Sequence, residues 1–332
     1  MDLKKIAISS LSFLTLKEKI CLSKSVASFD ELSTLSIDDI SKIIDRPFKS
    51  AKFNGKKLSA LVRFCAELME KQNIKSVCFD EDFEYYPALL RIIKDPPYML
   101  FYRGNLQVLK KECVSVVGTR RVCPESAKAA FEFARDAAKD NLTVVSGLAY
   151  GIDSLAHRGA LEGGTVCTSS GSTVAVLPCG IDTIIPSINK SLALEILRQK
   201  GCILSEYIPG TPAENFRFVQ RNRIIAALSP SVVIVQAPPA SGALITAEFA
   251  LDYNRDLVIH KSCLCENARL ISKSAEGKLA LKQKKYINRV EKYLEEGAPL
   301  VNNYSEYTAV KKDAPGAHTF KGTLNKQLNL FG

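Results

Sequence analysis

The sequence predicts an α/β protein: an extended Rossmann-like parallel sheet with helices on both faces, preceded by a small all-helical N-terminal domain. From residue 113 onward, apolar runs rich in Val and Ile recur. Each run ends in a turn containing Gly or Ser and is followed by a helical pattern, which is typical of a parallel α/β sheet. Residues 1 to about 70 instead carry apolar residues at helical spacing. A chain of 332 residues has room for about two domains.

The N-terminal region contains short apolar segments that begin at residues suited to capping helices, such as Ser28 and Ser36. We therefore expect residues 1–70 to form a small helical domain of the SAM or helix-hairpin-helix type. Pro87, Pro96 and Gly104 interrupt the next stretch and prevent long helices there. Residues 71–110 are accordingly expected to be a connector that carries short strands, one of them at 98–102.

Four apolar runs are predicted to be core strands of the main domain, which we expect to span 111–310. The runs, each with the residue that opens its turn, are 114–117 before Gly118, 142–145 before Ser146, 174–177 before Pro178, and 232–235 before Ala237. In an open parallel sheet the turns after the strands collect at one edge, where ligands of this fold class bind. The four turns are therefore expected to form one site.

The residues of these turns indicate phosphate binding. Gly118 and Gly147 allow a ligand to approach the backbone, and Ser241-Gly242 precedes a helical pattern whose first N–H groups are free to bind an anion. Basic residues lie near the same turns, at positions 120, 121, 190, 217, 221 and 223. A single glycine would be explained by a tight turn alone, but the combination suits a repeating phosphate. The candidate phosphate-binding residues are Gly118, Thr119, Arg120, Ser146, Gly147, Gly151, Gly180, Asn189, Lys190, Arg221, Asn222, Arg223, Ser241 and Gly242.

Other phosphate-binding and catalytic classes find no support in the sequence. No GxGxxG follows any of the four strands and no GxxxxGK[ST] occurs, so neither NAD binding nor nucleotide hydrolysis is expected. The ten cysteines form no CxxC pair, and the nearest approach to a metal motif is Cys263-Leu-Cys265. We expect no metal, no cofactor and reduced thiols in the cytoplasm. His157 is more typical of a packed helical histidine, although Asp153 four residues earlier allows it to help shape the turn.

The charge distribution favours a polyanionic partner. The chain has 45 Lys and Arg against 35 Asp and Glu, a formal charge of +10. Residues 261–332 alone contain 13 Lys and Arg against 7 Asp and Glu. We expect a basic helical insertion at about 265–296, which is either a solvated helix with an apolar stripe (Ile287, Val290, Leu294) packed on the core or an auxiliary DNA-contacting surface. No apolar run reaches the roughly 20 residues needed to cross a bilayer.

An ordered set of motifs resembles the DNA-processing (DprA/Smf) family over about residues 85–260. The set comprises Val-Val-Gly-Thr-Arg at 116–120, Val-Val-Ser-Gly-Leu-Ala-Tyr-Gly-Ile-Asp at 144–153, Ala-Val-Leu-Pro-Cys-Gly-Ile-Asp at 175–182, Gln-Arg-Asn-Arg at 220–223 and Ser-Gly-Ala-Leu-Ile-Thr at 241–246. The resemblance implies a homodimer that holds single-stranded DNA in a basic pocket, protects it and delivers it to the RecA recombinase in DNA uptake and recombination, without being an enzyme. It also implies that Arg120 and Lys190 are pocket cations. The family's Pro-Gly after its last matched strand is replaced here by residues 260–263.

Two further interpretations stay open. The alternative function is a Rossmann-type enzyme acting on a nucleotide-like small molecule, with Glu248 as its candidate carboxylate. The tail at 311–332 is expected to be flexible, and Gln327, Leu328, Leu330 and Phe331 resemble the short peptide that bacterial proteins insert into the replicase sliding clamp; docking of the tail on its own domain is the alternative. Phe216 and Phe218 are candidate base-stacking residues, and core packing is the more usual role for at least one of them.

Overall fold

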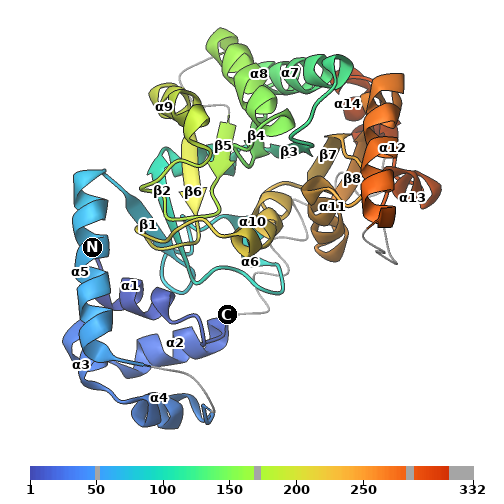
Figure 1. The fold of residues 1–332 in the computed structure, drawn as a ribbon. Coiled ribbons are helices and arrows are strands. Elements are labelled where there is room, and N and C mark those ends of the chain that lie inside the picture. Colours follow the sequence, from blue (N-terminus) through green and yellow to red (C-terminus); the bar gives the residue numbers. More distant parts are fainter. Residues whose placement is uncertain (49–52, 168–172, 282–287, 314–332) are drawn as a thin grey trace.

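A computed structural model describes residues 1–48, 53–167, 173–281 and 288–313 (Figure 1). Its centre is a nine-stranded sheet in the order β1-β2-β6-β5-β4-β3-β7-β8-β9. Seven neighbouring strands, from β6 to β9 in this order, pair in parallel, whereas β1 and β2 are antiparallel. The strands are β1 (Lys75–Cys78), β2 (Met99–Gly104), β3 (Cys113–Gly118), β4 (Thr143–Ser146), β5 (Thr173–Val176), β6 (Cys202–Ser205), β7 (Ser231–Gln236), β8 (Asp256–His260) and β9 (Leu300–Val301).

Helices cover both faces of the sheet because alternate residues of each strand point to opposite sides. Val116 of β3 packs in the core with α7 and α8, while its neighbour Val117 packs in the core with α10 and α11. Figure 1 shows α7 and α8 side by side, with α10 and α11 across the sheet from them. The helices of this part are α6 (Ala88–Arg91), α7 (Pro124–Lys139), α8 (Ile152–Cys167), α9 (Lys190–Arg198), α10 (Asn215–Ala227), α11 (Gly242–Asp252), α12 (Glu266–Leu281), α13 (Val290–Glu295) and α14 (Tyr304–Asp313). The predicted fold class is confirmed.

The N-terminal helices begin where the sequence places capping residues. Ser28 and Ser36 each accept a hydrogen bond from a backbone N–H in the first helical turn, and Thr15 forms a capping box with Glu18. Within the described residues of this region the helices are α1 (Leu3–Ser10), α2 (Leu16–Ser25), α3 (Phe29–Thr34), α4 (Ile37–Ile44) and α5 (Gly55–Lys71). Their apolar faces belong to the same hydrophobic cluster as Phe101 of β2 and the inner face of α9. The helical region therefore packs directly on the sheet.

The expected connector contributes structure to the sheet itself. Residues 71–110 contain β1, α6, β2 and a 3-10 helix, η1 (Leu106–Lys110). Because β2 pairs with β6, the two antiparallel strands extend the parallel sheet at one edge. The expected basic insertion contains α12 and α13, and Val290 and Leu294 pack against the core as the stripe predicts. Ile287 and the tail residues 327–331 lie outside the described residues.

The strand order places a topological switch point beside β3. From β3 the chain moves outward through β4, β5 and β6, and then returns to β7 on the other side of β3. The connections from β3 and β7 therefore diverge, and the carboxyl ends of these strands border the crevice where open α/β sheets bind ligands. None of the described helices combines the length and the apolar character needed to cross a bilayer.

Candidate functional site

The turns after β3 and β4 lie against each other at the carboxyl edge. The Ile152 N–H donates to the Thr119 carbonyl over 3.2 Å. Gly151 has φ +77°, and a Cβ atom there would lie 2.3 Å from the same carbonyl oxygen. A side chain at this position would push the two turns apart, so Gly151 is required by both its conformation and its surroundings. The arrangement places the exposed Arg120 beside residues 147–151.

Two buried and oppositely charged side chains, Arg221 and Asp153, support the turn after β4. Arg221 of α10 has only 3% of its surface exposed, and its Nη1 donates to the carbonyls of Gly147 (2.7 Å) and Val176. The Asp153 carboxylate accepts from the Gly147 N–H over 3.2 Å. Burial raises the pKa of Asp153 and lowers that of Arg221 to about 10, so the guanidinium stays charged at neutral pH. Arg221 therefore shapes the turn from inside the protein.

Lys190 is positioned through the residue before it. Asn189, at the end of the 3-10 helix η2 (Ser187–Asn189), is buried and donates through Nδ2 to the Leu148 carbonyl over 2.8 Å. Lys190 then begins α9 and is exposed. Because this hydrogen bond holds η2 against the turn after β4, the backbone of Lys190 is held in place beside that turn.

The N-terminus of α11 has the features of an anion site. Ser241 is its N-cap residue but makes no side-chain cap, and within the described part of the chain its Oγ has no hydrogen-bond partner. Gly242 is exposed, and a Cβ there would meet only Asn222 Nδ2, at 3.9 Å. Asn222 fixes this end by donating to the Gly242 carbonyl over 3.1 Å. An uncapped helix N-terminus with open space in front of it suits a phosphate oxygen.

Aromatic side chains lie among the cations. The Arg120 guanidinium stacks 5.2 Å from the ring centre of Phe218, and that of Arg217 lies 5.1 Å from the ring of Phe216. Phe216 is 51% exposed and Tyr150, in the turn after β4, is 48% exposed. Tyr150 was not among the site residues predicted from the sequence. The available signal was its place between the predicted turn glycines Gly147 and Gly151.

Several other predicted site residues make contacts inside the protein and support the backbone around the turns. Arg223 is engaged inside the protein, since its guanidinium pairs with Glu206 and donates to the Asp95 carbonyl over 2.7 Å. Ser146 is buried and donates to the Val116 carbonyl over 2.7 Å. Gly118 and Gly180 have no room for a side chain: a Cβ would lie 2.4 Å from Ile152 at the first and 2.5 Å from Asp182 at the second. Among the predicted cations, Arg120, Arg121 and Lys190 are exposed and Arg217 is partly exposed, whereas Arg221 and Arg223 are engaged inside the protein.

The acid–base candidates lie apart from these turns or are engaged in packing. Glu248 is six residues beyond Gly242, roughly 9 Å along α11, and its Oε1 accepts from Asn288 Nδ2 over 2.7 Å. His157 is fully buried, with Nδ1 2.7 Å from Thr173 Oγ1, and burial lowers its pKa to about 3. The contacts of His157 agree with the packed histidine that the sequence suggests.

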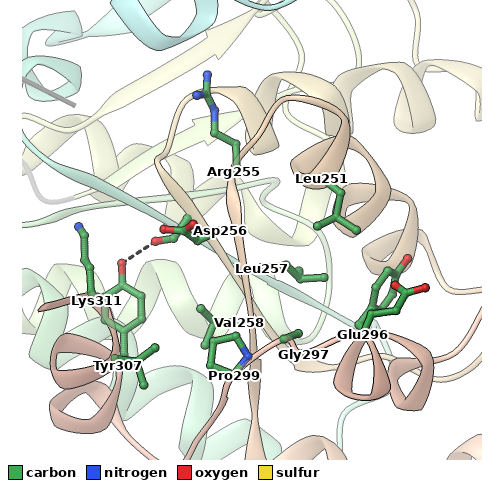
Figure 2. A pocket seen from close by; sticks show the side chains of 14 residues that line it. Leu251, Arg255, Asp256, Leu257, Val258, Glu296, Gly297, Pro299, Tyr307 and Lys311 are labelled. Atoms are coloured by element: carbon green, nitrogen blue, oxygen red, sulfur yellow. Dashed lines mark hydrogen bonds between the residues drawn. The ribbon is translucent and has the colours of Figure 1, made fainter. Parts of the chain in front are cut away.

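A cavity of about 360 Å³ lies at the opposite edge of the sheet. Its lining includes Asp256, Val258, Tyr307 and Lys311 (Figure 2). Ser231 Oγ and Tyr307 OH, which also border it, are 2.5 Å apart. Because Ser231 and Asp256 begin β7 and β8, this cavity is at the amino ends of the strands and separate from the cationic turns.

The fold and the carboxyl edge define a Rossmann-like α/β protein whose candidate ligand is an anion. The family model for DNA recombination-mediator protein A matches residues 76–304. The chain belongs to this family.

Individual relatives agree with this assignment. Protein Smf of Borreliella burgdorferi is 33% identical over 266 residues, which cover 79% of this chain and 80% of that protein. DNA processing protein DprA of Streptococcus pneumoniae is 42% identical over 172 residues, and the match spans little more than half of it, 58%.

Solved structures show the same fold. The S. pneumoniae DprA structure matches with a TM-score of 0.65 at 29% identity, covering 93% of this chain and 98% of that one. DNA processing protein A of Helicobacter pylori, whose structure is described for its single-stranded DNA binding mode, matches with a TM-score of 0.50 at 26% identity, covering 77% of this chain and 96% of that one.

Proposed function

We propose that the protein binds single-stranded DNA along the carboxyl edge of its sheet, and that it acts in the cytoplasm to protect this DNA and deliver it to RecA in DNA uptake and recombination. The observation that carries the proposal is the pair of exposed cations, Arg120 and Lys190, on rigidly supported turns to either side of residues 147–151. The single-stranded DNA binding mode described for the H. pylori relative supports the same choice of ligand.

Binding follows from three kinds of contact. Arg120 and Lys190 neutralise successive phosphates, and the free N–H groups at the start of α11 hydrogen-bond another. Tyr150 and Phe216, both about half exposed, provide faces on which bases stack. Because these contacts address phosphates and base faces rather than base edges, little sequence preference is expected.

The test is fluorescence anisotropy of a labelled poly-dT oligonucleotide over a salt series. Arg120→Ala and Lys190→Ala are each expected to weaken binding and to reduce the slope of log K against log salt by about 0.7 per lost phosphate contact. Tyr150→Ala is expected to weaken binding about tenfold without changing that slope, because stacking contributes roughly 1–3 kcal/mol per base and involves no counterion.

Lys110→Ala is the matched control. Lys110 is exposed but precedes β3, at the other edge of the sheet, so its loss should leave both affinity and salt slope unchanged. Binding that survives both Arg120→Ala and Lys190→Ala would reject the pocket. The alternative, an enzyme acting on a nucleotide-like small molecule, would then be examined by hydrolysis screens of the wild type against Glu248→Gln.

The partners are proposed from the family resemblance. RecA delivery predicts that the protein speeds RecA loading onto DNA coated with single-strand binding protein, and Lys190→Ala should reduce this effect.

The proposed homodimer is tested by sedimentation of the purified protein. Clamp binding through Gln327, Leu328, Leu330 and Phe331 is tested by calorimetry of the tail peptide with the clamp, and the absence of heat would exclude it.

A further inference from the structure

Cys265 meets Cys123 and Glu125, which are far from it in the sequence, beside the candidate site. Cys123 Sγ and Cys265 Sγ are 3.6 Å apart although 142 positions separate them in the chain. The carboxylate of Glu125 completes the group, and its three potential ligand atoms all lie within 4.8 Å of one another. Cys123 is buried, Cys265 is partly exposed and Glu125 is exposed, so the group is open to solvent on one side.

The spacing of the sulfurs allows a hydrogen bond between the two thiols and also fits two ligands on one metal ion. A disulfide would place them about 2.05 Å apart. Two Zn–S bonds of about 2.3 Å at a tetrahedral angle separate the sulfurs by roughly 3.8 Å, close to the observed 3.6 Å. Soft thiolates with a carboxylate form a donor set that suits Zn²⁺.

Hydrogen bonds hold each member of the group in place. Cys123 precedes α7 and its N–H donates to Gln236 Oε1 over 3.0 Å, while the Cys265 carbonyl accepts the Arg269 N–H at the start of α12 over 3.0 Å. Asn267 Nδ2 donates to Glu125 Oε1 over 2.7 Å. Such outer partners orient metal ligands, and here they reduce the rearrangement that binding would require.

We propose that Cys123, Glu125 and Cys265 bind one Zn²⁺ ion, with a solvent molecule as the fourth ligand. Each thiol releases its proton to solvent as its Zn–S bond forms, and the carboxylate binds in its ionised form. The ion joins the start of α7 to the start of α12, and thereby fastens the basic helical segment to the Rossmann core. Because its ligand Cys123 is only three residues after Arg120, the ion would also stabilise the turn that carries Arg120.

The test uses the full chain, freed of metal and kept under reductant without oxygen, and titrated with Co²⁺ as a spectroscopic probe. One equivalent should bind with tetrahedral visible bands and a thiolate charge-transfer band, and Zn²⁺ should displace it. Cys123→Ser and Cys265→Ser should each abolish the charge-transfer band or weaken metal binding at least 100-fold. Glu125→Gln, at an exposed position where folding is not at risk, should weaken it about tenfold.

Cys21→Ser is the matched control, because Cys21 is an exposed thiol on α2 away from the group. It should bind Co²⁺ like the wild type. The proposal is overturned if the reduced, folded wild type takes up no equivalent of Co²⁺ or Zn²⁺, or if uptake survives all three ligand substitutions. A Cys123–Cys265 disulfide that reforms in air, without metal uptake after reduction, would also overturn it and identify a redox pair instead. The readout involves no DNA, so its outcome is independent of the proposed function.

Discussion

Residue type alone does not distinguish the cations that face solvent from the buried cations that support the fold. Arg120 and Arg221 both lie in motifs that resemble the family, and both were predicted as site residues. Arg120 is exposed, yet Arg221 is buried against two backbone carbonyls. The sequence indicated which edge carries the site. It could not show which of the predicted cations are exposed and which are buried. Burial depends on how α10 packs beneath the turn after β4, and no local pattern encodes that packing.

Gly147 should be essential to the packing of the buried side chains of Arg221 and Asp153. A Cβ at this position would lie 2.7 Å from both Arg221 Cζ and Asp153 Oδ2. Gly147→Ala should therefore separate the buried charges and lower the free energy of unfolding by about 3 kcal/mol. Urea unfolding followed by circular dichroism measures this loss.

The control for this prediction is Gly242→Ala. Gly242 has open space where its Cβ would stand, so the substitution should change the unfolding free energy by less than about 1 kcal/mol. Equal stability of the two variants would show that the packing of Arg221 and Asp153 does not require a glycine at position 147.

His157 should make the fold sensitive to acid. Burial lowers its pKa from an ordinary 6.5 to about 3 because the charged imidazolium loses its hydration. Below pH 6.5 the unfolded chain binds a proton that the folded chain excludes, so the stability contributed by the neutral ring is complete above pH 6.5 and is lost as the pH falls toward 3. At pH 4.5 the expected loss is about 2–3 kcal/mol.

His157→Asn isolates this contribution. Asparagine retains a polar atom near the place of Nδ1, which faces Thr173 Oγ1, but it does not titrate. Urea unfolding at pH 7.5 and pH 4.5 should show a smaller acid loss in the variant than in the wild type. If both proteins lose the same stability, His157 is not the group responsible.

At the scale of elements, strong patterns were predictable and weak ones were not. The Val-rich runs of β3, β4, β5 and β7 were predicted within a residue or two at each end, because apolar runs rich in Val and Ile between turn residues are a clear signal. The strand β6 has the same length as β4 and β5 but was not recognised, since its residues, Cys-Ile-Leu-Ser, contain no valine. The antiparallel pairing that brings β1 and β2 onto the sheet also depends on contacts distant in sequence.

Asn189 should act on DNA binding through the element that it positions. Asn189→Ala removes the bond from Nδ2 to the Leu148 carbonyl, which loosens η2 and the Lys190 ammonium group that follows it. Affinity for poly-dT should fall although Asn189 is itself buried. The double variant with Lys190→Ala should bind no more weakly than Lys190→Ala alone, within about 0.5 kcal/mol. Additive losses would instead mean that Asn189 supports some other contact.

On the scale of the whole molecule, the N-terminal helices and the sheet share one hydrophobic core. Ile6 of α1, Phe101 of β2 and Ile203 of β6 are fully buried in one continuous hydrophobic cluster. The sequence predicted that the helices exist, because their caps and periodicity are local features. It could not predict their docking, since the apolar faces look the same whether they pack on each other or on a sheet.

A shared core predicts that the chain unfolds as one cooperative unit. Ile6→Ala leaves a cavity in the N-terminal helices and should cost about 2–5 kcal/mol. If the helices and the sheet unfold together, scanning calorimetry should show the entire transition shifted to lower temperature, as it should for the matched Ile259→Ala in β8, another fully buried isoleucine. An independent helical domain would behave differently: Ile6→Ala would then produce a separate early peak and leave the main transition at its wild-type temperature. Because loss of the shared core would expose Phe101 to solvent, the same coupling implies that the carboxyl edge of the sheet cannot keep its stability without the N-terminal helices.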